Sequence, residues 1–292
     1  MQNISHRGAI FEESRRRLFG LAYRMLGSKA DAEDMVQEAY IRWHQANTDE
    51  IRSPEAWLVT VVTRLCIDRL RSATRERETY PGTWLPEPLF TDSFSSPDEQ
   101  LELASNLSMA FMILLERLAP VERAAFLLHD VFDCDYPQIA QIIGKSETTC
   151  RQVVRRARER IRRERPRFEA SEADRRRLIE KFAEAIDAQD EQTLLSLFAE
   201  DATLVADGGG KAAAVRNVIH GAQRITRLFV RSAHRHPGTV TRAFLPINGE
   251  LGLVTFIDGH PIWALSFDIE GNRIQALYNM LNPDKLKDLG QL

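Results

Sequence analysis

The chain has 292 residues, of which 43% are hydrophobic, and its 39 Lys and Arg against 42 Asp and Glu give a formal charge of −3. This composition excludes low-complexity, collagen-like and largely disordered chains, and the length suits two or three packed domains. Three widely spaced cysteines without a Cys-x-x-Cys pair, and no apolar run of signal-peptide or membrane-spanning length, predict a soluble protein of the reducing cytoplasm without disulfides, structural zinc or membrane segment.

Helical periodicity opens the chain. Apolar residues from Phe11 to Met25 recur at spacings of three and four, and Gly27 suits the position just past a helix end. Ser28 with Asp31 resembles a capping box that begins a second helix, and Ser53-Pro54 begins a third helix that runs toward Arg77. These signals predict a three-helix bundle.

Two faces of this bundle carry charge. The second helix has an acidic face of Asp31, Glu33, Asp34 and Glu38, which duplex DNA would repel and a basic protein surface would attract. The third helix combines Trp57 with a basic stretch that suits a melted DNA strand, because bases stack on aromatic rings and phosphates need neutralising. That stretch contains Arg64, Arg69, Arg71, Arg75 and Arg77. Trp57 as an ordinary core residue is the alternative.

Prolines are concentrated between Thr79 and Asp98, which predicts a linker without helix. Its segment Trp84-Leu85-Pro86-Glu87-Pro88-Leu89 is apolar, and a spacer has no need of an exposed tryptophan. We expect this segment to dock onto another surface. The alternative is an apolar segment without a docking partner.

Helical periodicity resumes in residues 101–118, 121–132, 137–143 and 146–165. The last two helices, separated by Gly144 and begun by Ser146, have the organisation of a helix-turn-helix. Nine arginines against three glutamates give residues 146–167 a net charge of about +6, enough to neutralise several phosphates. Residues suited to reach base edges are Thr148, Arg151, Gln152 and Arg155. A solvated charged helix is the alternative.

After Arg167 the pattern changes to that of a separate α+β domain. Helices are expected at 173–188 and 193–198, and strands at 202–206, 240–246, 251–257, 261–267 and 273–278. Glycine-containing turns between these strands predict a curved antiparallel sheet.

Residues in this domain leave an enzyme as an alternative. Candidate acid-base groups are His220, His234, His236, Asp258 and His260, but their spacing defines no catalytic dyad. Asp207-Gly208-Gly209-Gly210-Lys211 lacks the Walker spacing, which argues against nucleotide binding. A pocket for a small apolar regulator is a further alternative.

Three segments in chain order resemble extracytoplasmic-function sigma factors. They are Asp-Ala-Glu-Asp-Met-Val-Gln-Glu-Ala-Tyr at 31–40, Ser-Pro-Glu-Ala-Trp-Leu at 53–58 followed by Arg64 and Ile-Asp-Arg-Leu-Arg at 67–71, and Leu-Ala-Pro-Val-Glu-Arg at 118–123. The resemblance implies a factor without catalytic residues, metal or cofactor that binds core RNA polymerase, through the β′ clamp helices and the β flap, and promoter DNA.

The resemblance also implies roles for residues. Polymerase would be bound by Asp31, Asp34, Gln37, Glu38 and Trp43. The −10 promoter element would be recognised by Trp57, Arg64, Asp68, Arg69, Arg71 and Arg75. The −35 element would be recognised by Ser146, Thr148, Arg151, Gln152, Arg155, Arg156 and Arg158.

The remaining motifs resemble a subgroup of these factors that carries a fused SnoaL-like, NTF2-like cone. The motifs are Trp84 to Leu89, Asp207 to Lys211, and Asn282-Pro283-Asp284-Lys285-Leu286. The resemblance implies that the cone contacts the linker and modulates activity in cis. We therefore expect two all-α domains followed by an α+β cone, with residues 1–78 as region 2, 79–100 as linker, 101–167 as region 4 and 168–292 as regulatory domain.

Overall fold

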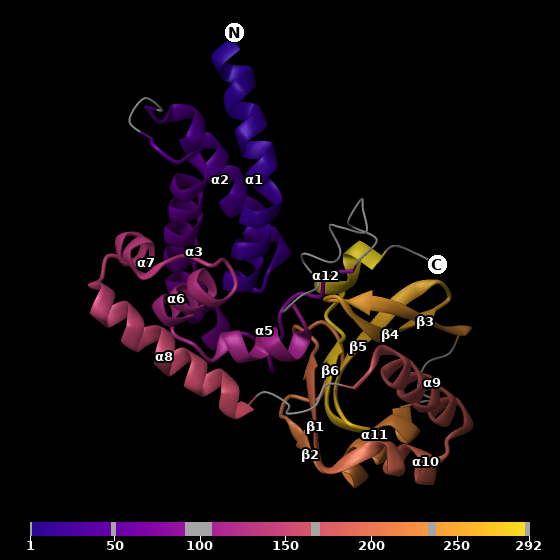
Figure 1. The fold of residues 1–292 in the computed structure, drawn as a ribbon. Helices are drawn as coiled ribbons and strands as arrows, with labels where there is room; N and C mark the ends of the chain where they lie inside the picture. The colour runs from indigo at the N-terminus through magenta and orange to yellow at the C-terminus, as the bar shows by residue number, and fades with distance from the viewer. Residues whose placement is uncertain (1, 48–50, 91–106, 165–169, 233–237, 290–292) are drawn as a thin grey trace. The chain divides into compact units, whose positions relative to one another are not determined.

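The computed structural model describes residues 2–47, 51–90, 107–164, 170–232 and 238–289, without the side chains of residues 2–6, 74, 75 and 164 (Figure 1). The chain folds as two compact units, residues 1–78 with 112–164 and residues 79–111 with 165–292. The linker segment thus belongs to the unit that contains the C-terminal domain. No helix among the described residues is long and apolar enough to cross a membrane.

The first unit begins with the predicted three-helix bundle, formed by α1 (Gln2–Leu26), α2 (Lys29–Gln45) and α3 (Pro54–Glu78). Gly27 ends α1 with a positive φ of 66°, and its N–H donates to the carbonyl of Tyr23 at 2.7 Å. The hydroxyls of Ser28 and Ser53 accept hydrogen bonds from N–H groups three residues later, at 3.2 and 3.3 Å. The capping residues predicted from the sequence therefore set the start of both helices.

Four shorter helices complete this part of the chain: α5 (Met109–Glu116), α6 (Pro120–Asp130), α7 (Tyr136–Ile143) and α8 (Glu147–Glu164). Gly144 ends α7 in the left-handed conformation, and the Ser146 hydroxyl accepts from the N–H of Thr149 in the first turn of α8. Ile139 and Cys150 are buried where the two helices meet. The predicted helix-turn-helix is confirmed, and the helix expected at 101–118 is found as α5, with residues 101–106 of that range outside the described residues.

Two arginines tie the end of α1 to the rest of the first unit. Arg123 on α6 is 2% exposed, and it donates to the Met25 carbonyl at 2.6 Å and pairs with Glu116 at 2.7 Å. Arg77 on α3 donates to the Leu26 carbonyl at 2.7 Å and also pairs with Glu116. The C-terminal carbonyls of α1 are thereby satisfied by positive charges, which the helix dipole favours.

The second unit contains a six-stranded sheet in the order β2-β1-β6-β5-β4-β3. Its elements in chain order are α9 (Glu172–Ala188), α10 (Glu191–Leu197), β1 (Phe198–Asp207), β2 (Ile219–His220), α11 (Ala222–Ser232), β3 (Val240–Ile247), β4 (Glu250–Ile257), β5 (His260–Glu270), β6 (Arg273–Met280), α12 (Pro283–Leu286) and a 3₁₀ turn, Lys287–Leu289. Helices α9, α10 and α11 lie against the curved sheet (Figure 1). Phe182 centres their core, with its ring edge-on to those of Phe198, Phe229 and Phe267.

The α+β fold class is confirmed, but the sheet is not entirely antiparallel. Strands β3 to β6 form the predicted antiparallel hairpins, whereas β1 runs parallel to β6, with Asp207 opposite Met280. No turn joins β1 to β6, so no local signal sets their direction. The two-residue β2 is too short to show a period, and neither it nor α11 was expected from the sequence.

Candidate nucleic-acid and regulatory interfaces

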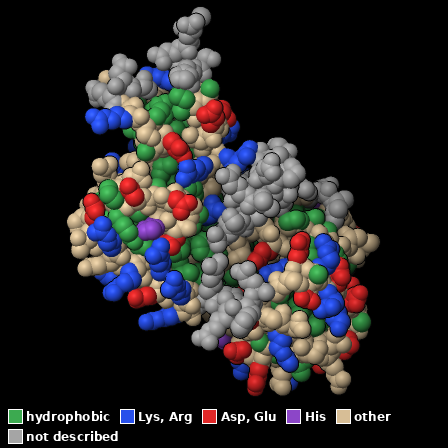
Figure 2. Space-filling model, viewed as in Figure 1, with side chains coloured by type: hydrophobic (Ala, Val, Ile, Leu, Met, Phe, Trp, Pro, Cys, Tyr) green, Lys and Arg blue, Asp and Glu red, His purple; other side chains and the backbone are tan. Residues whose placement is uncertain are grey.

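Helix α8 presents the basic face expected of a DNA-recognition helix. Cys150, Val154, Ala157 and Ile161 are buried at spacings of three and four, so the arginines between them face outward. The exposed members of the predicted −35 set are Ser146, Thr148, Arg151, Gln152, Arg155 and Arg156. Figure 2 shows Lys and Arg side chains gathered over this helix.

Protein contacts orient two of these arginines. Arg151 pairs with Glu147 at 3.1 Å, and its guanidinium lies 5.1 Å from the centre of the Tyr136 ring. Arg158 is half-buried and pairs with Asp130 on α6 at 2.7 Å. Arg151 is thus aligned but exposed, while Arg158 contributes to packing of α8 on α6.

The predicted −10 residues lie along α3, and two of the arginines have carboxylate partners. Arg69 bridges Asp31 on α2 and Glu76, at 3.0 and 2.8 Å. The hydrogen bond with Arg69 also holds the pKa of the Glu76 carboxyl below its usual range. Arg71 pairs with the exposed Asp68 at 3.0 Å. The Arg75 side chain lies outside the described part of the structure.

Arg64 has partners on the helix-turn-helix. Its side chain donates to the carbonyls of Gln141 and Ile142, at 2.8 and 3.0 Å, which are the last carbonyls of α7. A helix C-terminus attracts a cation, so this contact fastens α7 to α3. These two carbonyls compete with any phosphate or base for the Nε and Nη2 donors of Arg64.

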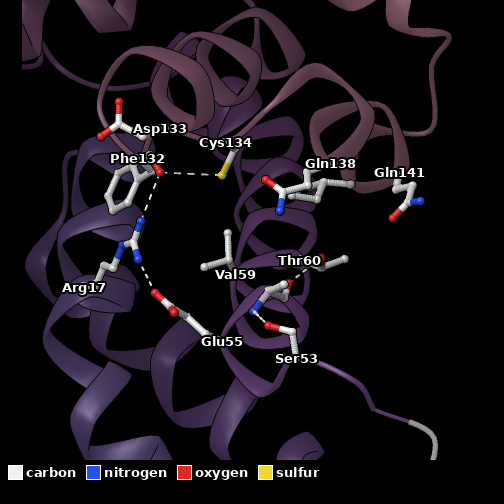
Figure 3. Close-up of a pocket in the computed structure, with 12 residues that line it drawn as sticks. Arg17, Ser53, Glu55, Val59, Thr60, Phe132, Asp133, Cys134, Gln138 and Gln141 are labelled. Atoms are coloured by element: carbon white, nitrogen blue, oxygen red, sulfur yellow. Dashed lines mark hydrogen bonds and ion pairs between the residues drawn. The ribbon is translucent and has the colours of Figure 1, made fainter.

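A cavity of about 330 Å³ adjoins this contact, between the first half of α3 and residues 132–142 (Figure 3). Arg17 lies at one side, where it pairs with Glu55 and donates to the Phe132 carbonyl at 3.0 Å. Burial raises the pKa of the Cys134 thiol at the cavity wall, which disfavours a reactive thiolate. No pattern in the sequence indicates this cavity, because its walls are about 80 residues apart in the chain.

The acidic face of α2 is accessible in part. Asp34 and Gln37 are exposed, whereas Asp31 is engaged by Arg69 and Glu38 pairs with Arg42 at 2.8 Å. Tyr40 and Ile41 beside this face are 39% and 42% exposed, an apolar contribution that the sequence analysis missed. Exposed apolar groups next to charged ones are common in protein interfaces.

Both tryptophans of this bundle take part in its core. Trp43 is only 1% exposed, and its indole N–H donates to the Arg7 carbonyl at 3.1 Å. This burial argues against the direct polymerase contact expected of Trp43, because its place on the helix belongs to the core. Trp57 is half-buried with its ring 5.5 Å from that of Trp43, so it belongs in part to the same core.

In the second unit, the linker is held at Leu85. The Leu85 N–H donates to the Asp207 carboxylate at 2.9 Å, and the Leu85 carbonyl accepts from the Lys285 ammonium at 2.5 Å. Lys285 also pairs with Asp207 at 2.8 Å and lies 4.4 Å from the centre of the Trp84 ring. Tyr80 closes this network, since its hydroxyl donates to Asp207 and accepts from Asn282, at 2.7 and 2.9 Å. We refer to Tyr80, Leu85, Asp207, Asn282 and Lys285 as the docking contact.

The other residues of the three motifs surround the docking contact. Leu85 to Leu89 are all buried, and so are Asp207, Gly208, Asn282 and Leu286. Gly209 has a φ of 58°, and a Cβ there would lie 2.3 Å from the Asn282 amide nitrogen, so close approach excludes a side chain. Lys211, which follows Gly210, forms an ion pair at 2.5 Å with Asp284, which follows Pro283.

The parallel pair of strands explains why these motifs meet. Asp207 ends β1, Asn282 follows β6, and the ends of adjacent parallel strands lie at one sheet edge. The N–H groups of Leu281 and Asn282 both donate to the Asp207 carbonyl, at 2.8 and 2.9 Å. The sequence analysis named the motifs but gave no role to Tyr80, whose hydroxyl joins two of them.

The candidate acid-base residues that the structure describes, His220, Asp258 and His260, are not brought together in one site. His220 on β2 and His260 on β5 are separated by β1 and β6, and Asp258 accepts from the Thr239 N–H at 2.9 Å. His234 and His236 lie outside the described residues. Within the described ranges, no group of three or more His, Cys, Asp or Glu side chains is placed to hold a metal ion.

Comparisons with known proteins agree with this arrangement. Residues 10–76 match the model of Sigma-70 region 2, and residues 108–161 match Sigma-70, region 4. The ECF RNA polymerase sigma factor SigJ of Mycobacterium tuberculosis is 37% identical over 94% of this chain and 91% of its own. A second relative from that organism, named "Probable ECF RNA polymerase sigma factor SigI", is 34% identical over 96% of this chain and 95% of its own. The crystal structure of SigJ superimposes with a TM-score of 0.78 at 33% identity, covering 96% of this chain and 98% of the other.

Proposed function

Because the chain belongs to the extracytoplasmic-function RNA polymerase sigma factors, we propose that it is a transcription initiation factor whose C-terminal domain regulates it in cis. Sigma factors bind core RNA polymerase and promoter DNA, so the chain is a transcription regulator rather than an enzyme. The observation that carries the regulatory part is the docking contact, which engages both backbone polar groups of Leu85 with the C-terminal domain.

For the polymerase we propose that the α2 face of Asp34, Gln37 and Glu38, with Tyr40 and Ile41 beside it, binds the β′ clamp helices. Region 4 would contact the β flap. Exposed acidic groups flanked by apolar ones support a basic, partly apolar partner surface. Because this interaction takes place with polymerase, we also assign the protein to the cytoplasm.

For promoter DNA we propose that α3 recognises the −10 element and α8 the −35 element. The exposed basic face of α8 supports the second assignment. On α3, Arg64, Arg69 and Arg71 already have protein partners. The described arrangement therefore fits a state in which the α3 arginines are withheld from DNA, and promoter binding would exchange these partners for phosphates.

A small apolar ligand remains the alternative regulatory input for the C-terminal domain. The aromatic cluster around Phe182 occupies the core between the sheet and its helices, which favours linker docking over ligand binding. A DNA-binding regulator that works without polymerase is the other alternative, and it does not need the acidic α2 face.

The cis proposal is tested by in vitro transcription with core polymerase and the Lys285→Met variant. Methionine keeps the length of the side chain but cannot donate to the Leu85 carbonyl or pair with Asp207. We expect transcript yield to differ severalfold from the parent. Lys287→Met, an exposed lysine two residues later, is the matched control and should leave yield unchanged. Equal yields from all three proteins would contradict regulation through the docking contact.

The same reactions test the polymerase assignment independently. Replacing Asp34 and Glu38 together by lysine reverses the charge of the proposed interface, so we expect loss of core binding in a pull-down assay. Asp201→Lys, at an exposed position on β1, is the control and should bind normally. Unchanged core binding by the double variant would exclude this face of α2.

A further inference from the structure

The turn between β3 and β4 makes a second contact with the linker, through Asn248, which belongs to none of the three sequence motifs. Asn248 is 1% exposed, and its side-chain oxygen accepts from the Leu89 N–H at 2.9 Å. Its own N–H donates to the Leu89 carbonyl at 2.8 Å, and Phe90 forms a β-bridge with Ile247. The linker is therefore paired with this hairpin as a short antiparallel strand would be.

The Asn248 side chain also forms a hydrogen bond with a residue 18 positions after Leu89. The Asn248 amide nitrogen donates to the carbonyl of Leu107, at 3.0 Å. Leu107 is buried two residues before α5 begins at Met109. One amide group thus joins the end of the docked linker to the start of the first helix of region 4.

The turn itself does not require this amide. Asn248 has a φ of 53° and Gly249 a φ of 79°, the conformation of a two-residue hairpin turn. In the next hairpin turn, Asp258 and Gly259 have φ values of 50° and 80°. An aspartate at position 248 would therefore suit this turn equally well. Unlike an ionised aspartate, asparagine offers both an acceptor for Leu89 and a donor for Leu107 at this one position.

We propose that Asn248 is a positioning residue whose side chain fixes both Leu89 and Leu107 on the C-terminal domain, independently of the docking contact. The C-terminal domain then holds three points on the path to region 4. The docking contact holds Leu85, and Asn248 holds Leu89 and Leu107. The hydrogen bonds can be tested without polymerase; only their effect on transcription rests on the proposed cis regulation.

Two substitutions in the full chain separate the two bonds. Asn248→Gly suits the positive φ and removes both side-chain bonds, whereas Asn248→Asp keeps an acceptor for Leu89 and loses the donor to Leu107. Hydrogen exchange of three amides reports the result: Leu85 in the docking contact, Leu89, and Phe111, whose N–H donates to Ser108 in the first turn of α5. Asn272→Asp, the same change at an exposed turn residue, is the control.

We expect exchange at Leu89 to accelerate about fivefold in Asn248→Gly and to stay at the parental rate in Asn248→Asp. Exchange at Phe111 should accelerate in both variants, and Leu85 should be unaffected in both. Unchanged Leu89 exchange in Asn248→Gly would overturn the fastening of the linker, and unchanged Phe111 exchange would overturn the tie to region 4. An equal acceleration at Leu85 would show that the two contacts are not independent.

Discussion

Arg123 is a buried guanidinium whose two partners, the Met25 carbonyl and Glu116, have little access to water. Arg123→Met would remove the donor to the Met25 carbonyl and leave Glu116 paired with Arg77 alone, and we expect it to lower the free energy of unfolding of the first unit by about 2 kcal/mol. Urea unfolding measures the change. Arg155→Met removes an exposed arginine of a weak 3.8 Å pair and should change stability by less than about 0.5 kcal/mol. Similar values for both variants would contradict the role given to Arg123.

Tyr80 makes the docking contact sensitive to alkaline pH. Burial and the adjacent Asp207 carboxylate raise the pKa of Tyr80 above its ordinary value of 10.0. Above about pH 10 the unfolded chain therefore loses a proton that the folded chain keeps, so stability is constant below this pH and falls above it. Tyr80→Phe lacks this dependence because phenylalanine has no proton to lose. We expect the urea midpoints of the two proteins to converge between pH 9 and about pH 11; a constant difference would contradict the shifted pKa.

At the scale of elements, the proposed −35 role of α8 predicts that its first part recognises bases and its last part binds phosphates. Arg151 lies near its N-terminal end, so Arg151→Ala should weaken binding to a −35 duplex by about 1 to 3 kcal/mol and relax preference at one base pair. Arg163→Ala, near the other end, should weaken binding to all sequences alike. It should also lower the number of counterions released on binding, measured from the salt dependence of affinity, by about one. Fluorescence anisotropy on matched and mismatched duplexes distinguishes the two. A uniform loss for Arg151→Ala would restrict that residue to phosphate contact.

Local sequence signals predicted most of these elements because their causes are local. Ser28, Ser53 and Gly144 cap or end helices through bonds to residues three or four positions away. The parallel pairing of β1 with β6 and the bonds of Arg64 to α7 join residues more than 70 positions apart. Patterns of period 2 or 3.6 contain no information about such pairings. The expected polymerase role of Trp43 came from the resemblance alone, whereas its helical position among buried residues indicates the core.

At the scale of the whole molecule, the second unit covers apolar linker residues that a shortened chain would expose. Leu85, Leu89 and Phe90 are 2%, 4% and 6% exposed. A chain ended after Arg167 loses the sheet that covers them, so we expect it to bind a hydrophobic dye and to aggregate more than the parent. A chain ended after Leu281 lacks only the Asn282 and Lys285 side of the docking contact and should transcribe like Lys285→Met. If the chain ended after Arg167 shows no stronger dye fluorescence than the parent, the second unit does not shield these linker residues from water.

The site motifs were recognisable in the sequence, but how they work was not. Asp207 and Lys285 belong to motifs, yet only the folded sheet shows that they hold the same linker residue. Asn248 belongs to no motif, because an Asn-Gly pair is an ordinary hairpin signal and its use to hold Leu107 is invisible to any local pattern.

The pairing of β1 with β6 also has a consequence for the order in which the protein becomes regulated during synthesis. Regions 2 and 4 are complete once the ribosome has passed Glu164, whereas Asn282 and Lys285 are added about 120 residues later. At bacterial rates of elongation this interval lasts on the order of 10 s. During it, the nascent chain carries both promoter-recognition helices without its complete docking contact. Under the proposed cis regulation, any effect exerted through the docking contact can therefore begin only near the end of translation.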